Sequence, residues 1–226
     1  MSFIENLNHE VCRSLWDMAA EDEGMKAPAS RRPNLIWPLY RDSKKGNGNH
    51  PRISEQEARF AMAIILSNDH SRHFSVETPT RETYQFKGEK PISAQTDLTI
   101  FRADGNGLER DINVEFKSHL PVQGSVDKDI EKLLREPYGG NWFHVLKNTN
   151  RGTLPALFKK MRAAAAAAAE VGPGPAELPI HFCFCCVGKR WACFRSVSKT
   201  DLVYPGSDVF DPEGIEQGKW TIWQPE

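Results

Sequence analysis

Apolar and polar residues alternate most regularly over residues 112–119, where the pattern predicts a β-strand. The apolar members share one face of this strand and the charged members share the other: Val114 and Phe116 against Glu115 and Lys117. A second extended run covers residues 96–101, and the turn sequence Asp-Gly-Asn-Gly fills residues 104–107 between the two runs. The sequence therefore predicts a β-hairpin over residues 96–117.

Apolar residues at helical spacing predict helices over residues 2–20, from Ser54 onward, over residues 125–136 and over residues 154–171. Two capping-box sequences mark helix starts, each pairing a serine with a glutamate three residues later: Ser2 with Glu5, and Ser54 with Glu57. Further strands are predicted at residues 73–86, 142–146, 180–187, 190–197 and 220–223. Residues 21–52 are rich in proline and contain a Gly-Asn loop, so we expect them to be irregular.

The expected order through the middle of the chain is helix, three strands, helix and strand. This order mixes hairpin-linked strands with crossover helices, so it predicts an α/β fold with a central mixed sheet flanked by helices. We expect residues 1–52 to form an N-terminal helix and an irregular arm packed on the core. Residues 53–226 would then form the main domain, with a C-terminal strand extension.

The 226 residues carry 29 basic and 30 acidic side chains, which gives a net charge of −1. This balance argues against a broadly cationic surface, although a local basic groove beside an acidic site remains compatible with it. No apolar run reaches the ~20 residues that a membrane helix needs, and the first residues lack the pattern of a secretory signal. We therefore expect a globular cytoplasmic protein that has no membrane partner.

Most of the cysteines cluster in one predicted pair of strands: Cys183, Cys185, Cys186 and Cys193. An odd total of five, without an export signal, indicates reduced thiols. The CxxC spacing of Cys183 and Cys186 is also found in zinc and redox sites. However, positions three apart on a strand point to opposite faces, and free cysteine packs as a small hydrophobe. We therefore favour core packing over zinc.

The predicted hairpin brings candidate metal ligands together. Asp97 and Glu115 can face each other across adjacent strands, and Lys117 lies roughly 7 Å from Glu115 on the same face. Two carboxylates and a lysine are suited to holding Mg²⁺ and cleaving a phosphodiester. A solvated strand face with a Glu–Lys pair would give the same pattern. His119, two residues beyond Lys117, is a candidate phosphate contact or a strand-end histidine without a role.

This order of elements, with these charged residues on it, resembles the PD-(D/E)XK nuclease superfamily, which has the restriction-endonuclease-like fold. The family places one acid at the start of its second core strand and an acid-x-lysine on its third. Asp97 corresponds to the first acid, Glu115 to the second, and Lys117 to the lysine. The resemblance covers roughly residues 53–147.

Many members of the family also carry a glutamate on the first core helix. Glu57 is the best match to this position, with Glu55 as the alternative, but Glu57 also sits where a capping box requires a glutamate. The proline that gives the motif its name is absent, since Thr96 precedes Asp97.

The resemblance implies a metal-dependent deoxyribonuclease that hydrolyses phosphodiester bonds of DNA. Asp97, Glu115 and the main-chain carbonyl of Phe116 would hold Mg²⁺ or Mn²⁺. Lys117 would stay protonated beside the two carboxylates and act electrostatically. Glu57 could complete the metal shell. Restriction-type enzymes often act as dimers, so a homodimer is the assembly expected by analogy.

Two other functions fit the sequence. A nuclease-like fold that no longer cuts could serve as a nucleic-acid-binding or assembly module, although the intact set of two acids and a lysine argues against lost catalysis. Alternatively, the first helix could contact a partner through an apolar stripe that would otherwise pack on its own domain. This stripe consists of Ile4, Leu7, Val11, Leu15 and Met18.

Overall fold

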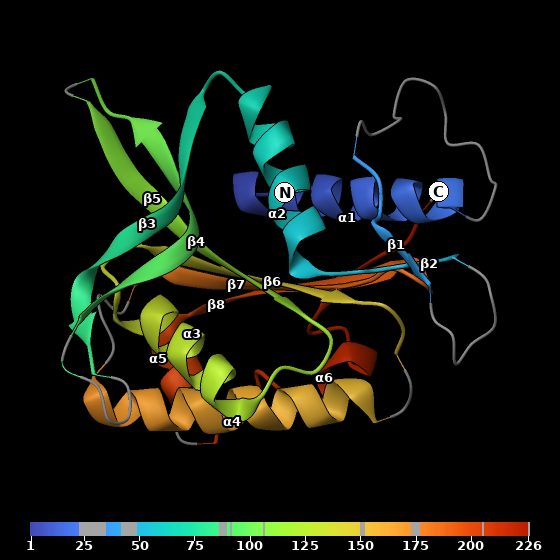
Figure 1. Cartoon of the computed structure of the whole chain (residues 1–226). Coiled ribbons are helices and arrows are strands. Elements are labelled where there is room, and N and C mark those ends of the chain that lie inside the picture. Colours follow the sequence, from blue (N-terminus) through green and yellow to red (C-terminus); the bar gives the residue numbers. More distant parts are fainter. Residues whose placement is uncertain are drawn as a thin grey trace.

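A seven-stranded β-sheet lies between two layers of helices (Figure 1). The computed structural model describes residues 1–22, 35–41, 49–85, 90, 92–105, 107–149, 152–172, 177–204 and 206–225. The helices are α1 (Phe3–Asp22), α2 (Glu55–Ser67), α3 (Gln123–Arg135), α4 (Thr153–Val171), α5 (Lys199–Val203) and α6 (Glu213–Glu216). The strands are β1 (Leu39–Arg41), β2 (Asn49–Pro51), β3 (Arg72–Tyr84), β4 (Ile92–Ala103), β5 (Leu108–Ser118), β6 (Gly139–Leu146), β7 (Pro179–Cys186), β8 (Trp191–Ser198) and β9 (Thr221–Trp223).

The sheet is mixed, with its strands in the order β3-β4-β5-β6-β7-β8-β9. Neighbours from β3 to β5 are antiparallel, β5, β6 and β7 are parallel, and β7 to β9 are antiparallel again. The two parallel connections run through α3 and α4, which lie on the same face of the sheet, while α1 and α2 cover the other face (Figure 1). This arrangement confirms the predicted α/β fold with a central mixed sheet flanked by helices.

The predicted order of helix, three strands, helix and strand is present as α2, β3, β4, β5, α3 and β6. The prediction that residues 21–52 are irregular is wrong in part, because β1 and β2 pair as a short antiparallel ladder. Pro51 is tolerated at the end of this ladder, where a missing N–H breaks no central pairing. The third predicted helix begins two residues early, at Gln123. Residues 23–34, 42–48 and 86–89, and Asn106 of the predicted turn, lie outside the described residues.

The hydrophobic core consists of two clusters, one on each face of the sheet. On β5 the alternation sends Val114 and Phe116 into the cluster beneath α1 and α2. Glu115 therefore points to the opposite face, where α3 and α4 pack. The second cluster lies between those two helices and β6, β7 and β8. The alternation read from the sequence thus decides which layer each charged side chain meets.

The N-terminal helix packs on its own sheet. Its complete apolar stripe belongs to the first core cluster, so within this structure it is not available to a partner. Asn8 and Asn141 of β6 form a reciprocal pair of buried amide hydrogen bonds, of 2.8 and 3.1 Å. The Trp16 indole N–H donates to the Cys186 carbonyl oxygen of β7 at 3.2 Å. These polar contacts fix the position of α1 along the strands.

All five cysteines are buried and free. Cys12 of α1 meets Cys183 of β7, with 3.7 Å between the sulfur atoms, and burial raises the pKa of both thiols. No three His, Cys, Asp or Glu side chains in the described part of the chain converge as a metal-binding group. The structure therefore supports core packing for the cysteines. None of the described helices is long and apolar enough to cross a membrane.

Candidate active site

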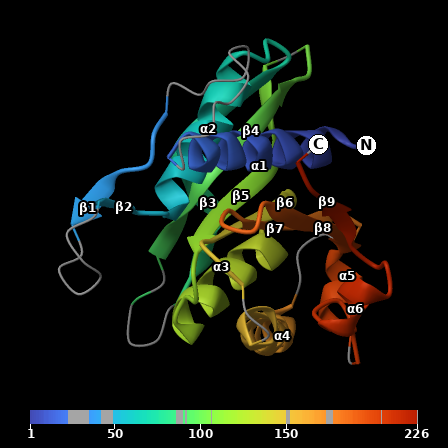
Figure 2. The ribbon, with the colours of Figure 1, turned by 90° about the vertical axis from the view of Figure 1, so that its right-hand side faces the viewer.

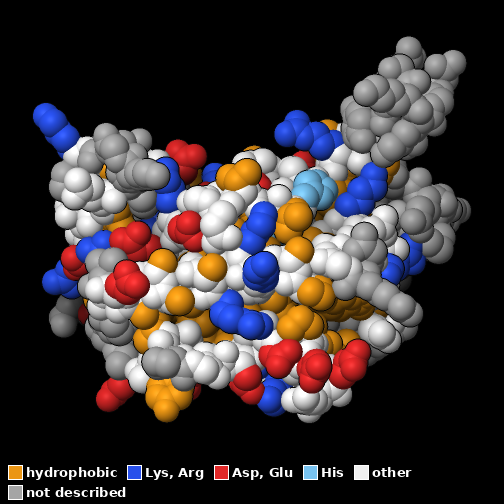
Figure 3. Space-filling view, turned by 90° about the horizontal axis from the view of Figure 1, so that it is seen from below, with side chains coloured by type: hydrophobic (Ala, Val, Ile, Leu, Met, Phe, Trp, Pro, Cys, Tyr) orange, Lys and Arg blue, Asp and Glu red, His pale blue; other side chains and the backbone are white. Residues whose placement is uncertain are grey.

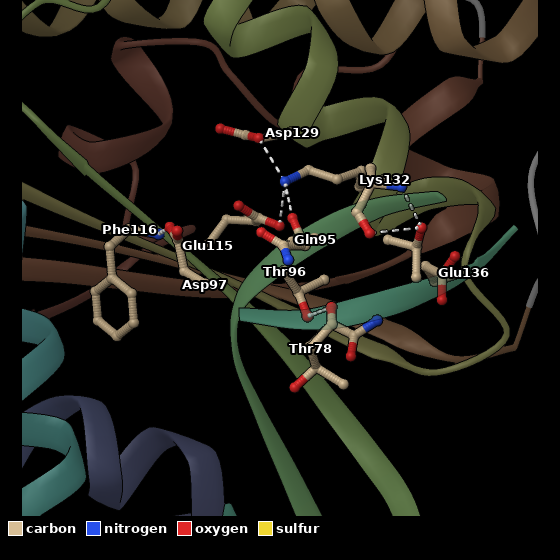
Figure 4. A network of polar contacts seen from close by, with 12 residues as sticks. Thr78, Gln95, Thr96, Asp97, Glu115, Phe116, Asp129, Lys132 and Glu136 are labelled. Atoms are coloured by element: carbon tan, nitrogen blue, oxygen red, sulfur yellow. Dashed lines mark hydrogen bonds and ion pairs between the residues drawn. The ribbon is translucent and has the colours of Figure 1, made fainter. Parts of the chain in front are cut away.

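The β4–β5 hairpin brings the two predicted acids together, as the alternation and the turn sequence indicated. Toward the site, backbone pairing between the strands ends with Leu98 opposite Val114, beyond a register shift between Ile100 and Phe101. Beyond this pair, the carboxylate of Asp97 accepts a hydrogen bond from the backbone N–H of Phe116 at 2.8 Å (Figure 4). A side chain thus takes the N–H that a continued ladder would have used. Asp97 is thereby placed beside Glu115 at the point where regular pairing ends.

Cations from the helices pair with the carboxylates of this site, and Figure 4 shows Lys132 between Glu115 and Asp129. Arg59 of α2 donates to Asp97 at 2.6 Å. Lys132 of α3 lies 2.6 Å from Glu115 and 2.8 Å from Asp129, which is also on α3. The site therefore carries a third carboxylate that was not predicted.

Lys117 turns toward this third carboxylate. Its ammonium group forms an ion pair with Asp129 and donates to the carbonyl of Phe116 at 3.2 Å. Together with the contacts of Arg59 and Lys132, this gives three cations that pair with Asp97, Glu115 and Asp129, and the exposed Glu77 also lies 3.6 Å from Arg59. The predicted residues Asp97, Glu115 and Lys117 are therefore embedded in an ion-pair network.

The carboxylates of the site differ in their exposure to solvent. Glu115 is only 1% exposed, whereas 25% of the Asp97 side chain reaches solvent. Burial raises the pKa of Glu115 well above its usual range; the Asp129 charge adds to this rise and Lys132 opposes it. Burial alone would lower the pKa of Lys117, but the surrounding carboxylates raise it. The lysine therefore stays protonated, as the sequence predicted.

The two helix glutamates do not join the other candidate residues. Glu57 completes the capping box of α2, accepting from the Ser54 N–H at 3.2 Å and from the Ser54 hydroxyl at 2.5 Å. Glu55, the alternative, accepts from the Ser118 hydroxyl at 3.0 Å. The residue that α2 contributes to Asp97 is Arg59. The capping interpretation of Glu57 is therefore confirmed, and a metal-binding role for it has no support among the described contacts.

Three residues of the network were missed by the sequence reasoning: Arg59, Asp129 and Lys132. Asp129 could have been noticed, because it follows Val126 by three residues and precedes Leu133 by four, on the inward stripe of α3. A charged residue on such a stripe needs a buried partner. Arg59 gives no comparable signal, since its partner lies 38 positions away in the chain.

A further layer of polar contacts holds the network in place. Lys132 also donates to the carbonyl of Gln95 at 2.8 Å, which ties α3 to β4 (Figure 4). Next to it, the hydroxyls of Thr96 and Thr99 lie 2.9 Å apart, and Thr99 donates to the Asn113 side chain at 3.1 Å. These side chains are buried, and their hydrogen bonds fix the strands that carry Asp97 and Glu115.

The donors at this site suit a hard divalent cation in kind. Asp97 and Glu115 supply carboxylate oxygens and Phe116 supplies a carbonyl, and Mg²⁺ is commonly held by one or two carboxylates and several waters. In this structure ammonium and guanidinium groups occupy these oxygens. An incoming cation would therefore replace Arg59, Lys132 and Lys117 at these oxygens.

The chain matches no protein-family model, no curated protein and no solved structure.

Proposed function

We propose that this protein is a metal-dependent nuclease that hydrolyses phosphodiester bonds of DNA on a restriction-endonuclease-like core. The order α2, β3, β4, β5, α3 and β6 supports this proposal, because the superfamily core has the same order of helix, meander, helix and strand. The observation that carries it is the hydrogen bond from the Phe116 N–H to Asp97. It brings the first acid to the acid-x-lysine strand, as the motif requires.

Asp97, Glu115 and the Phe116 carbonyl are the groups that would hold Mg²⁺ or Mn²⁺. Such an ion, when bound, polarises the phosphodiester and lowers the pKa of a bound water. Lys117 is protonated and 15% of its side chain is exposed, so it would stabilise negative charge that develops on the phosphate. Arg59 and Lys132 hold the two acids in place in the resting protein. Asp129 holds the Lys117 ammonium group on the same side as Glu115.

A second candidate function is favoured by the ion pairs themselves. Three cations already neutralise three carboxylates, so the network is complete without a metal ion. In that case the protein would be a nuclease-like module that binds nucleic acid or a protein partner and does not cut. The two candidates differ in whether a divalent cation can displace the lysines and the arginine.

A cleavage assay with a matched control distinguishes the two functions. The wild type is incubated with plasmid and labelled oligonucleotides with and without Mg²⁺ or Mn²⁺, beside the variants Asp97→Asn and Lys117→Ala. We expect metal-dependent cleavage by the wild type and a loss of about 100-fold or more in each variant. Asp111→Asn is the control, because Asp111 lies on the same strand in an ion pair with Arg72, at 2.8 Å, outside the network.

Titration calorimetry with Mn²⁺ gives a second readout that does not depend on activity. Binding that disappears in Asp97→Asn and persists in Asp111→Asn supports the metal site. If the wild type neither binds Mn²⁺ nor cuts, the nuclease proposal is wrong and the non-cutting module is favoured. Equal cleavage by the wild type and both site variants would also contradict the assigned residues.

A further inference from the structure

Two adjoining hollows lie where β5 and β6 end, with volumes of about 250 and 310 Å³. Both are lined by His119, which follows β5, and by Lys147, which follows β6. The first hollow is also lined by Arg52, from the segment before α2. Among the described residues, no acidic side chain lines either hollow. We call Arg52, His119 and Lys147 the basic rim.

Within the described part of the chain, Arg52 and Lys147 of the basic rim differ from the cations of the acid site in their ion pairing. Arg52 is exposed and Lys147 is partly exposed, and neither forms an ion pair with any described residue. In contrast, Arg59, Lys117 and Lys132 are all engaged by carboxylates. A phosphate group would have to compete with those carboxylates at the acid site. At the basic rim it would meet positive charge that is free to bind it.

His119 is held rigidly between the two hollows. Its backbone N–H donates to Val145 at 2.9 Å, and its carbonyl accepts from the His144 ring at 2.7 Å. Its ring Nε2 lies 2.8 Å from the Ile53 carbonyl. Because that carbonyl can only accept, Nε2 carries the hydrogen of this bond. The histidine is therefore held in place by contacts from β6 and from the segment before α2.

The basic rim lies close to the acid site in the chain. His119 is two residues beyond Lys117, on the segment that continues β5. Figure 2 looks along α4 onto this end of the molecule. The second hollow is also lined by Gly152 and Thr153, where α4 begins, so the positive end of that helix adds to the field there. Figure 3 shows the face that α3 and α4 cover, where Lys and Arg side chains lie among apolar and acidic ones.

We propose that the basic rim binds the phosphodiester backbone of a nucleic acid strand. Unpaired cations around adjoining hollows suit a chain of phosphates, since phosphate contacts supply most of the affinity of nucleic-acid-binding proteins and act on any sequence. We further infer that the strand passes from the basic rim to Asp97 and Glu115, and this second part rests on the proposed nuclease function.

The test measures binding without a divalent metal, so that cleavage plays no part. Fluorescence anisotropy with labelled single-stranded and duplex DNA is recorded over a range of salt concentrations. The double variant Arg52→Ala/Lys147→Ala is expected to bind about tenfold more weakly at low salt. Its plot of log affinity against log salt should be shallower by roughly 1.4 to 1.8, the change expected for two lost phosphate contacts.

The control is Arg81→Ala/Lys90→Ala, which also removes one arginine and one lysine charge, but from exposed positions elsewhere on the chain. We expect it to retain wild-type affinity and salt dependence. The proposal is wrong if the wild type binds neither oligonucleotide, or if the two double variants behave alike.

Cleavage by the same proteins separates the two proposals. If Arg52→Ala/Lys147→Ala raises KM for DNA and leaves kcat near the wild-type value, both proposals are supported. If the wild type binds through Arg52 and Lys147 but never cuts, the basic rim stands and the nuclease function fails. If the wild type cuts and the double variant binds and cuts equally well, the basic rim is wrong and the nuclease function stands.

Discussion

The carboxylate of Glu115 is almost completely buried, and the ion pair with Lys132 offsets the cost of burying its charge. The ammonium group of Lys132 is shared between Glu115, Asp129 and the Gln95 carbonyl, so its hydrogen-bonding capacity is filled. Buried ion pairs of this kind add little to stability compared with apolar residues, but removing one partner is costly. A single substitution in this network should therefore have a large effect on stability.

Replacing Lys132 by methionine keeps the length of the side chain and removes its charge. We expect a loss of about 3 kcal/mol or more in the free energy of unfolding near neutral pH, because Glu115 becomes an unpaired buried charge. Lys128→Met is the control, since Lys128 is exposed on the same helix. Urea unfolding of both variants and the wild type gives the comparison, and equal stability of Lys132→Met and the wild type would show that the charge is not buried.

The pH dependence of this loss has a definite sign. Burial and Asp129 raise the folded-state pKa of Glu115 above its ordinary value of 4.5. A group of this kind favours the folded state below its unfolded pKa, and that contribution is lost as the pH rises through the folded pKa. The stability gap between Lys132→Met and the wild type should therefore be smallest near pH 4 and grow toward about pH 7. A gap that widens on acidification would contradict the assignment.

At the scale of single elements, the first turns of α2 have two roles. Its capping box orders the helix start, and Arg59, one turn later, reaches Asp97. Ser54→Ala should cost about 1 kcal/mol, because the first N–H groups lose their side-chain acceptor and Glu57 loses its hydroxyl partner. The free energy of unfolding measures this cost.

A contact at the C-terminal end of α3 sets the position of this helix. The carboxylate of Glu136, the residue after the helix, accepts from the backbone N–H groups of Arg81 and Glu82 at 3.0 and 2.9 Å. It also accepts from the Tyr84 hydroxyl at 3.0 Å. These bonds join α3 to β3 where the pairing of β3 with β4 shifts register. Lys132 is thus carried to Glu115 by a helix that is anchored one turn further on.

The four long helices and the strands of the seven-stranded sheet were readable from the sequence, because periodicity and caps are local, whereas the short elements β1, β2, α5 and α6 were not predicted. The β5 alternation placed Val114 and Phe116 in the core and Glu115 on the other face, and the turn sequence placed Asp97 opposite. What local patterns could not supply is which helix residue meets which strand residue. Arg59 and Lys132 reach Asp97 and Glu115 only after two helices have packed on opposite faces of the sheet, and that packing depends on the whole core.

At the scale of the whole molecule, the five thiols report on the integrity of the core. All are buried, and burial raises the pKa of Cys12, Cys183 and Cys193, so little thiolate forms in the folded state. We expect negligible reaction with a thiol reagent such as Ellman's reagent in native buffer and reaction of all five in denaturant. Rapid modification of the native protein would show that the α1 layer opens readily.

The contacts of α1 also have a consequence for how the chain is made. Cys12 and Cys183 are 171 positions apart, and Asn8 and Asn141 are 133 positions apart. At ribosomal speeds of about 5–20 residues per second, the last of these partners is synthesised roughly 9–34 s after its counterpart. Throughout that interval the apolar stripe of α1 lacks the part of the sheet that β7 supplies. The helix therefore completes its packing late, and a nascent chain stalled before β7 would display part of that stripe to the cell's chaperones.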